Sequence, residues 1–487
     1  MYYLGIDFGG GSSKATLIDE LGNVIATASS EYPTTYVENG LATQKPIDWF
    51  NAAIKNIKSI LSTGIDPKLI ECICFDAATH TAVLLDENED VICDSIYWTD
   101  TRSVKEKEFL LENYKDYLFD KTKHLPDTIW TLPELMYLYN NYQDAYRRIK
   151  HIVFAKDYVR HLFCAGLVTD YIEAEGSMLF DFDNNCWDEK LLSLAHLDIS
   201  QMPKIVSPLD VLGTINEWAS KVSGLSTTTK VLCGCTDTAM EVFASGGVKK
   251  GDMTLKLATA GRICLITDKP YPDKNIINYS HLNKGLFYPG SGTKSCASSL
   301  RWFRDTLGGT YKELDQLAEQ IPLGSDGLIF LPYLMGELTP YANPNIRGGY
   351  FGLSATHTKG HLVRALLEGV AFSLLDCYLY LKDHGLEVSN RAFALGGGSK
   401  SPLWRQIVSD VLGIELYVTE NNDSSFGGAL CAATACGKFT SLEDAIKRTQ
   451  KIVGRVKPDL ENHEKYMKIF KKYQQIASFL VEFYKNE

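Results

Sequence analysis

The first strand and the turn after it constrain the fold most. Residues 5–15 read GIDFGGGSSKA, in which an apolar strand ends at an acid and leads into three glycines, two serines and a lysine. Glycine lets a backbone approach an anion closely and turn its N–H groups toward it, while hydroxyl and ammonium groups add donors. The residues of the predicted phosphate-binding turn are Gly9, Gly10, Gly11, Ser12, Ser13 and Lys14. Asp7 would hold Mg²⁺, usually through water. Taken alone, the segment also fits a plain turn between strands.

Three more glycine-rich or acidic turns follow predicted strands, at 234–237, 258–262 and 396–400. In the first, Asp237 ends the apolar strand Val231–Cys235. A carboxylate there suits the acceptance of a hydroxyl proton during phosphoryl transfer. Helix capping is the other role that an acid plays at such a position.

The second turn is the tip of a predicted hairpin between Thr254–Ala258 and Ile263–Thr267. The hydroxyl of Thr259 and the backbone around Gly261 could reach a terminal phosphate, although a tight hairpin needs no ligand.

The third turn contains Gly396, Gly397, Gly398 and Ser399, between the strand Phe393–Leu395 and a predicted helix over Leu403–Leu412. Bare glycine backbone can support a flat ring, and Ser399 is expected to cap the helix. A turn without a ligand is the alternative.

A different mixture of side chains surrounds residue 80. His80 stands between two threonines, and residues 98–102 read WTDTR, which adds Trp98 and Asp100. Hydroxyl-binding polar groups next to an aromatic wall are typical of a sugar site, although a single histidine is more often structural.

Composition favours an ordinary globular protein with small-molecule partners. The chain has 487 residues, of which 45% are hydrophobic, enough for two to three domains. Its formal net charge of −11 argues against nucleic-acid partners and anionic membranes. Residues 1–4 lead directly into a strand, without a basic targeting segment or a membrane-spanning run, so we expect a cytoplasmic protein.

The twelve cysteines are scattered along the chain. Two C-x-C pairs, Cys72/Cys74 and Cys233/Cys235, lie in strand-like runs. Burial of small thiols explains them more simply than a four-thiolate metal site, so no metal is predicted there.

The order of predicted elements is similar in the two halves of the chain. Strands at Tyr3–Ile6, Lys14–Asp19 and Val24–Ser29 precede a helix at Ile47–Leu61, and the later half repeats the strand–glycine–helix pattern. The run Ser245-Gly246-Gly247 is the expected boundary. We therefore predict two related α/β halves, an N-terminal domain over residues 1–245 and a C-terminal domain over 246–487.

Several of these segments together resemble the FGGY carbohydrate kinases. The second family signature is met by GGYFGL at 348–353 and HLVRALLE at 361–368. Further matching segments are the opening GIDFGGGSSKA, GCTDTA at 234–239, GLIFLPYLMGELTP at 327–340 and GGGSKSPLWRQIVSDVLG at 396–413. Within the family the chain is most similar to the xylulokinase group.

The resemblance implies a two-domain, actin-like ATPase fold of the ribonuclease-H-like class, with ATP, Mg²⁺ and a sugar bound in an interdomain cleft. It implies that Asp237 is the catalytic base and that Asp7 organises Mg²⁺. By the same resemblance, the turns at 9–14, at Thr259 and Gly261, and at 396–399 bind ATP. His80, Trp98 and Asp100 match positions near the sugar. The resemblance leaves a homodimer open.

Departures from the xylulokinase pattern fall on the sugar side. Residues 78–81 read ATHT where Gln-Met-His-Gly is typical, and Thr238 stands where an Asn usually follows the base. Thr79 and Thr238 are therefore candidate substrate-binding residues that could change selectivity.

We expect phosphorylation of a ketopentose, D-xylulose to D-xylulose 5-phosphate. Another ketose, a polyol or an aldonic acid is the alternative acceptor, and a non-catalytic actin-like ATP-binding protein is a more distant one. A dinucleotide-binding oxidoreductase is disfavoured because the first turn lacks GxGxxG spacing and leads into a strand.

Overall fold

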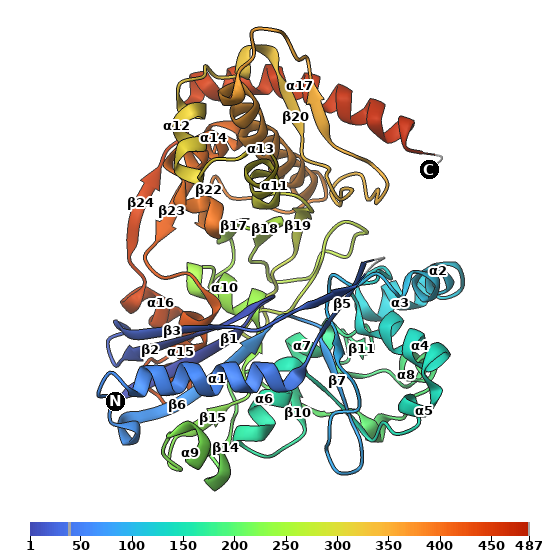
Figure 1. Ribbon diagram of the computed structural model, residues 1–487, viewed down its shortest axis with the longest axis vertical. Coiled ribbons are helices and arrows are strands. Elements are labelled where there is room, and N and C mark those ends of the chain that lie inside the picture. The colour runs from blue at the N-terminus through green and yellow to red at the C-terminus, as the bar shows by residue number, and fades with distance from the viewer. Residues whose placement is uncertain (38–39, 486–487) are drawn as a thin grey trace. The chain divides into compact units, whose positions relative to one another are not determined.

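The computed structural model describes residues 1–37 and 40–485 (Figure 1). The described chain divides into two compact units, and neither is continuous in sequence. Unit 1 consists of residues 1–244, 279–286 and 421–450, and unit 2 of 245–278, 287–420 and 451–487. The domain boundary near residue 246 stays a prediction.

Unit 1 is built on a mixed sheet with strand order β14-β15-β6-β1-β2-β3, and β16 also pairs with β6. β2 runs antiparallel to both β1 and β3, whereas β6 is parallel to β1, and β15 and β16 are parallel to β6. The strands are β1 (Tyr2–Phe8), β2 (Ser12–Asp19), β3 (Val24–Glu31), β6 (Ile70–Ala77), β14 (Val211–Thr214), β15 (Lys230–Leu232) and β16 (Cys235–Thr236). The two parallel steps bring the carboxyl ends of β1, β6 and β16 to the same edge.

Different helices cover the two faces of this sheet. Alternate residues of a strand point to opposite faces, and Leu4, Ile6 and Phe8 of β1 pack in one core with Trp49 of α1 (Pro46–Leu61). On the other face lies α15 (Ser424–Ala435), which approaches so closely that a Cβ on Gly5 would lie 1.9 Å from the Ser425 carbonyl oxygen. Any side chain at residue 5 would therefore displace α15.

Several of the remaining elements of unit 1, including the helices between residues 104 and 146, lie to one side of this sheet (Figure 1). Its other strands are β4 (Thr35–Val37), β5 (Leu41–Gln44), β7 (Ala82–Leu85), β8 (Ser95–Ile96), β9 (His151–Phe154), β10 (Val168–Asp170), β11 (Phe180–Asp181), β12 (Cys186–Trp187) and β13 (Lys204–Val206). Its other helices are α2 (Val104–Asn113), α3 (Lys115–Thr122), α4 (Thr131–Asn141), α5 (Gln143–Tyr146), α6 (Ala155–Phe163), α7 (Tyr171–Glu175), α8 (Glu189–Leu194), α9 (Glu217–Ser223), α10 (Asp237–Ser245) and α16 (Leu442–Thr449). The short 3-10 helices are η2 (Pro67–Leu69) and η3 (Ile199–Gln201).

Unit 2 repeats the plan of unit 1 around a sheet with the order β19-β18-β17-β22-β23-β24. β18 is antiparallel to β17 and β19, β22 is parallel to β17, β23 is parallel to β22, and β24 is antiparallel to β23. When the unit 1 sheet is read in the order β3-β2-β1-β6-β15-β14, its neighbouring strands show the same succession of antiparallel and parallel pairs. The α/β fold class and the two related halves predicted from the sequence are thus confirmed.

The strands of the unit 2 sheet are β17 (Met253–Leu257), β18 (Gly261–Leu265), β19 (Gly290–Thr293), β22 (Arg391–Leu395), β23 (Glu415–Thr419) and β24 (Ile452–Val456). A separate pair consists of β20 (Ile329–Leu331) and β21 (Gly349–Phe351). The helices are α11 (Ala297–Leu307), α12 (Tyr311–Glu319), α13 (Lys359–Asp383), α14 (Pro402–Leu412) and α17 (Leu460–Phe483), with the 3-10 helices η4 (Ser325–Gly327) and η5 (Gly397–Lys400). The buried helix α13 forms the centre of the hydrophobic core.

In the described part of the chain, no helix combines the length and apolar character needed to span a bilayer.

A buried ion cluster stabilises the part of unit 1 that follows β9. The Lys156 ammonium lies 2.6 Å from a carboxylate oxygen of Asp157 and 2.9 Å from one of Asp170, and all three side chains are fully buried. Burial alone would lower the pKa of Lys156, but these two carboxylates raise it well above its ordinary value. Asp170 also caps α7 by accepting hydrogen bonds from the amides of Ile172 and Glu173. The ammonium therefore remains charged and neutralises an acidic helix cap.

Replacing this lysine should cost much of the stability of unit 1. In Lys156→Met, Asp170 loses its buried counter-ion and Asp157 keeps only Arg160, 3.9 Å away, so we expect the free energy of unfolding to fall by about 3–5 kcal/mol. Chemical denaturation followed by circular dichroism measures the change. Lys150→Met, at an exposed lysine close in sequence, is the matched control. Equal stability of the two variants would contradict the role given to the cluster.

Candidate active site

Three aspartates gather at the carboxyl edge of the unit 1 sheet. Asp7 is the last but one residue of β1, and the parallel register pairs it with Asp76 of β6. Asp76 in turn pairs with Cys235 of β16, and Asp237 follows that strand directly. Strands that are far apart in sequence thus bring Asp7 and Asp237, both predicted site residues, to one edge.

The environment of these acids suits a cation. Burial raises the pKa of Asp7 to about 7, and the nearby carboxylates of Asp237 and Glu241 add to the shift. Burial and the charge of Asp7 raise the pKa of Asp76 well above its usual range. The Oδ1 atom of Asp7 and both carboxylate oxygens of Asp76 are buried and accept no hydrogen bond from the described residues. A positive charge bound here would relieve the repulsion between the acids.

Magnesium fits this donor set, since it prefers oxygen ligands and usually retains several waters. Nowhere in residues 1–37 and 40–485 do three or more His, Cys, Asp or Glu side chains form a complete metal cage. A magnesium ion held here by one or two carboxylates, water and substrate phosphates would be consistent with both observations.

Side-chain hydrogen bonds from outside the turn hold the glycine turn between β1 and β2. The carbonyl oxygen of Gly10 accepts hydrogen bonds from the Thr34 hydroxyl (2.8 Å) and the Gln44 side-chain amide (3.0 Å). Among the described residues, the N–H groups of Gly10 and Gly11 have no hydrogen-bond acceptor. A Cβ at Gly10 would lie 2.3 Å from the Tyr97 hydroxyl oxygen, so the turn requires glycine there. It therefore offers backbone donors to an anion.

The remaining residues of the turn differ in their surroundings. Gly9 closes the turn by donating its N–H to the Ser12 carbonyl oxygen (3.0 Å). Ser13 is fully buried, and its hydroxyl accepts a hydrogen bond from the Asn56 amide (3.2 Å). The Lys14 ammonium forms a 2.8 Å ion pair with Asp423, the residue that caps α15. In this structure Ser13 thus contacts α1, and Lys14 anchors the start of α15.

Asp237 is held at the start of a helix. Gly234 adopts a φ of +77°, and a Cβ there would lie 1.9 Å from the Phe75 carbonyl oxygen, so the turn from β15 into β16 requires glycine. Asp237 then begins α10, and its Oδ1 accepts hydrogen bonds from the Thr238 amide (2.5 Å) and hydroxyl (3.1 Å). The partial positive charge of a helix N-terminus favours an ionised carboxylate. Thr238 therefore fixes the orientation of the predicted base.

His80 lies in a strained turn between β6 and β7. Its φ is +67°, which is uncommon for any residue but glycine. Its amide donates to the buried Glu173 carboxylate (2.8 Å), and its carbonyl oxygen accepts from the Thr131 hydroxyl (2.8 Å). The imidazole packs edge-on against Trp130, with 4.8 Å between ring centroids, and lies 6.3 Å from the ring of Tyr279. The strained turn thus presents an imidazole among aromatic rings.

The other predicted sugar residues have distinct environments. Thr79 is half-buried next to His80, and both side chains lie close to the backbone of Gly176. The Trp98 side chain is exposed. Asp100 is buried and its carboxylate accepts hydrogen bonds from the Ala42 amide and from the backbone and guanidinium of Arg102. Asp100 therefore holds the loop in this structure, and its contact with sugar stays a prediction.

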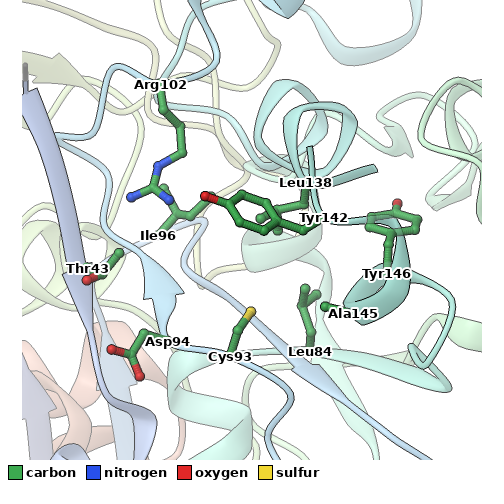
Figure 2. A pocket seen from close by; sticks show the side chains of 10 residues that line it. All are labelled: Thr43, Leu84, Cys93, Asp94, Ile96, Arg102, Leu138, Tyr142, Ala145 and Tyr146. Atoms are coloured by element: carbon green, nitrogen blue, oxygen red, sulfur yellow. The ribbon is translucent and has the colours of Figure 1, made fainter. Parts of the chain in front are cut away.

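A cavity of about 330 Å³ lies on the other side of Arg102. Figure 2 shows Thr43 and Asp94 on one side of it, and Ala145 and Tyr146 on the opposite side. None of the predicted site residues lines this cavity, so we do not assign it to the sugar.

In unit 2, the predicted phosphate hairpin is formed by β17 and β18. The carbonyl oxygen of Thr259 at its tip accepts hydrogen bonds from the amides of Cys296 (3.0 Å) and Ser298 (3.3 Å), at the start of α11. The Thr259 hydroxyl accepts one from the Arg301 guanidinium (2.7 Å). A Cβ at Gly261 would lie 2.9 Å from a Thr293 methyl carbon, so the hairpin packs through a glycine. The hairpin tip thus places the Thr259 hydroxyl next to the positively charged Arg301 side chain.

The glycine run at 396–398 lies next to this hairpin. Gly396 has a φ of +89°, and a Cβ there would lie 2.6 Å from the Leu257 carbonyl oxygen. Ser399 donates its hydroxyl proton to the Gly396 carbonyl oxygen, whereas Ser401 caps α14 by accepting from the Trp404 amide. The expectation that Ser399 caps this helix was therefore wrong, because the run continues as the 3-10 helix η5 before α14 begins.

The largest cavity described in unit 2, about 1000 Å³, opens between these two turns, α11 and α12. It is lined by predicted residues, Thr259, Gly397 and Gly398, and by side chains such as Arg301 and Tyr311. A Cβ at Gly397 would meet no atom within 4 Å. The volume suits a nucleotide, and the bare glycine backbone forms part of the wall.

Sequence reasoning missed three residues that contribute to these sites. Asp76 directly follows the apolar run Cys72–Phe75, just as Asp7 follows an apolar run, and this parallel could have revealed it. Glu173 and Arg301 had no such signal, because each acts through a contact with a residue far away in sequence, His80 and Thr259 respectively.

Comparison with known proteins identifies a family for both halves of the chain. Residues 2–244 match the N-terminal domain of the FGGY family of carbohydrate kinases, and residues 264–436 match its C-terminal domain. A xylulose kinase of Bacillus subtilis is 29% identical over 481 residues, which cover 98% of this chain and 96% of that protein. A gluconokinase of Bacillus licheniformis is 28% identical over 508 residues, covering 98% of each chain.

A solved structure has the same fold. The crystal structure of a xyloylose kinase from Brucella ovis superposes with a TM-score of 0.92 at 27% identity, covering 99% of this chain and 100% of that one. The two-domain α/β fold expected from the sequence, of the actin-like ATPase class, is thereby confirmed. The chain belongs to the FGGY family of carbohydrate kinases.

Proposed function

We propose that this carbohydrate kinase transfers the γ-phosphoryl group of ATP to a hydroxyl of a ketopentose, converting D-xylulose to D-xylulose 5-phosphate. The observation that carries the proposal is the set of Asp7, Asp76 and Asp237 at one sheet edge, next to a glycine turn with available N–H groups. Phosphoryl transfer needs both a proton acceptor and charge stabilisation, and these groups supply both.

Asp237 has the role of the base. Its place at the start of α10 favours the ionised form, and the Thr238 amide and hydroxyl fix one carboxylate oxygen. An oriented carboxylate can accept the proton of the sugar hydroxyl as the phosphorus–oxygen bond forms.

The charge of the phosphates is divided among several groups. The N–H groups of Gly10 and Gly11, and the Thr259 hydroxyl with its Arg301 partner, are donors for the phosphate oxygens. Asp7, with Asp76 close by, would hold Mg²⁺ largely through water, and that ion would neutralise phosphate charge when bound. The adenosine moiety would occupy the unit 2 cavity, with its base on the backbone of Gly397 and Gly398.

The surroundings of His80 favour a neutral sugar. Aromatic rings, a threonine hydroxyl and the Glu173 carboxyl lie around it. Hydroxyl groups can hydrogen-bond in such a site, and none of the groups just named is a lysine or arginine that could pair with a substrate carboxylate. This supports a ketose over the aldonic acid that the gluconokinase relative suggests as the other candidate.

The first test measures ADP release with Mg-ATP across D-xylulose, other ketopentoses, polyols and gluconate. We expect the highest kcat/KM with D-xylulose, because the site is suited to neutral hydroxyl groups. Turnover in Asp237→Asn should fall by about 10²–10⁴-fold, the usual contribution of a general base. Glu217→Gln, at an exposed acid on α9, serves as the matched control. A preference for gluconate would refute the sugar assignment, and an active Asp237→Asn enzyme would refute the base.

A second prediction concerns the sugar site. In His80→Asn, the new residue tolerates the left-handed backbone but lacks the imidazole. We expect kcat/KM for the sugar to fall by about tenfold or more, the cost of a lost polar contact. The KM for ATP should stay close to that of the unchanged enzyme. Steady-state kinetics with each substrate varied in turn measures both, and an equal rise in the two KM values would count against sugar contact by His80.

A third prediction concerns the nucleotide cavity. Gly397→Leu would project a side chain into the space assigned to the base, so the KM for ATP should rise by about tenfold or more, equivalent to about 1.4 kcal/mol of lost binding. Gly397→Ala adds a single methyl group that meets no atom within 4 Å, and it should bind ATP almost normally. Calorimetric titration with a non-hydrolysable ATP analogue measures both variants. Unchanged affinity in Gly397→Leu would place the base elsewhere.

A further inference from the structure

A second cluster of reactive side chains lies at the opposite end of the unit 1 sheet. Tyr3 of β1 and Lys230 of β15 both pair in register with Cys72 of β6, near the amino ends of these strands. Asp7 and Asp76 lie near the carboxyl ends of the same strands. The cluster is therefore separate from the proposed catalytic edge, and the proposed function does not use it.

Helix α15 brings a second cysteine to this cluster. Cys72 and Cys74, the first C-x-C pair, alternate with the core residues Ile73 and Phe75, so they face α15 with Gly5. The helix ends at Ala435, and Cys436 is its C-cap residue. The Lys230 ammonium lies 3.9 Å from the Cys436 sulfur, and Lys230 pairs in register with Cys72, so both cysteines adjoin the same lysine. The C-x-C motif thus lies near a cysteine that is far away in sequence.

The two thiols differ in accessibility. Cys72 is fully buried, whereas Cys436 is partly exposed. An oxidant in solution can therefore reach Cys436 before it reaches Cys72.

The charges around the pair make the two sulfur atoms chemically unequal. The Cys72 side chain lowers the pKa of Cys436, and the Lys230 ammonium, 3.9 Å from its sulfur, acts in the same direction. Burial and the Glu71 carboxylate oppose this shift without cancelling it. The Tyr3 hydroxyl donates to Glu71 at 3.0 Å, and Lys230 pairs with Glu71 at 3.2 Å. Cys436 is therefore the better nucleophile, because the thiolate is the reactive form of cysteine.

We propose that Cys436 and Cys72 form a redox-responsive pair that reacts with hydroperoxides. The Cys436 thiolate attacks the peroxide oxygen, the O–O bond breaks, and the products are Cys436 sulfenic acid and an alcohol or water. The Cys72 sulfur then attacks the sulfenic sulfur, which forms a disulfide and releases water. The peroxide is reduced by two electrons, and the two thiols are oxidised by two electrons.

The disulfide would join β6 to the end of α15. The other end of this helix carries Asp423, which binds Lys14 beside the phosphate turn. Oxidation would therefore fix one end of an element whose other end contacts the proposed nucleotide-binding turn.

The test is peptide mapping of the intact protein after stoichiometric hydrogen peroxide, with no reductant present. We expect a linked peptide that contains Cys72 and Cys436, two hydrogens lighter than the sum of the separate peptides, and its loss after dithiothreitol. This measurement needs no substitution, so a poorly folded variant cannot confuse it. Oxidation confined to other cysteines, or Cys436 sulfinic acid with Cys72 still reduced, would overturn the proposal.

Variants then test the assignment of roles. Cys72→Ala should leave a Cys436 sulfenic acid that reacts with dimedone, and Cys186→Ser, at an exposed cysteine, should still form the linked peptide. Lys230→Met should slow alkylation of Cys436 by iodoacetamide at pH 7 by about three- to tenfold, as expected for a rise of up to one unit in its pKa. Lys230→Arg should restore most of the rate. An unchanged rate in Lys230→Met would remove the lysine from the proposal, and absence of dimedone labelling in Cys72→Ala would refute the sulfenic acid.

Discussion

The close approach of α15 to β1 is the contact on which unit 1 depends. At Gly5 there is no room for a Cβ between the strand and the carbonyl oxygen of Ser425. Gly428 makes the matching approach from the helix, with a Cβ position 3.4 Å from an Asp76 carboxylate oxygen. Glycine is needed at residue 5, and a small residue at 428, for steric rather than conformational reasons. Through this contact the helix positions Asp423 and Ser425 beside Lys14 and Thr16.

The two sheets share one topology but use it for different chemistry. The turn between β1 and β2 in unit 1 corresponds to the β17–β18 hairpin in unit 2, and we propose that each binds phosphate. The next parallel strand is β6 in unit 1, which carries Asp76 as its last residue but one, and β22 in unit 2, which leads into the glycine run at 396. Near the ends of these equivalent strands there is thus an aspartate, Asp76, in unit 1 and the glycine run at 396 in unit 2. This division suits acid–base chemistry in one unit and binding of a flat base in the other.

Much of the fold could be predicted from local sequence patterns. The opening strand, glycine turn and strand, the helix at residues 47–61 and the hairpin at 254–267 have strong apolar periodicity and turn residues, and the structure has elements at each place. The family match also follows from linear motifs. What the sequence could not supply was any feature made by contacts between distant residues. The Lys14–Asp423 ion pair, the role of Ser401 instead of Ser399 as helix cap, and the return of residues 421–450 to unit 1 depend on packing that periodicity does not encode.

In the candidate site, too, some features could be recognised from the sequence and others could not. Asp7 and Asp237 could be recognised because each follows an apolar strand, and strand ends in parallel sheets converge. Asp100 illustrates the opposite case, since a motif position alone does not reveal that four donors already surround its carboxylate. Whether a carboxylate already has all its hydrogen-bond donors depends on the residues that fold around it, and the spacing of residues in the sequence does not show this.

The discontinuity of unit 1 has a consequence for biosynthesis. The face of β1 that contains Gly5 leaves the ribosome long before the helix that covers it, which is encoded more than four hundred residues later. Until α15 emerges, the nascent sheet exposes Tyr3, Cys72 and Cys74 on that face. Contacts of such long sequence separation form slowly, and uncovered apolar strands are prone to aggregation. Native unit 1 can therefore be completed only after residues 287–420 of unit 2 have been synthesised, and the cell's chaperones have that interval in which to protect β1.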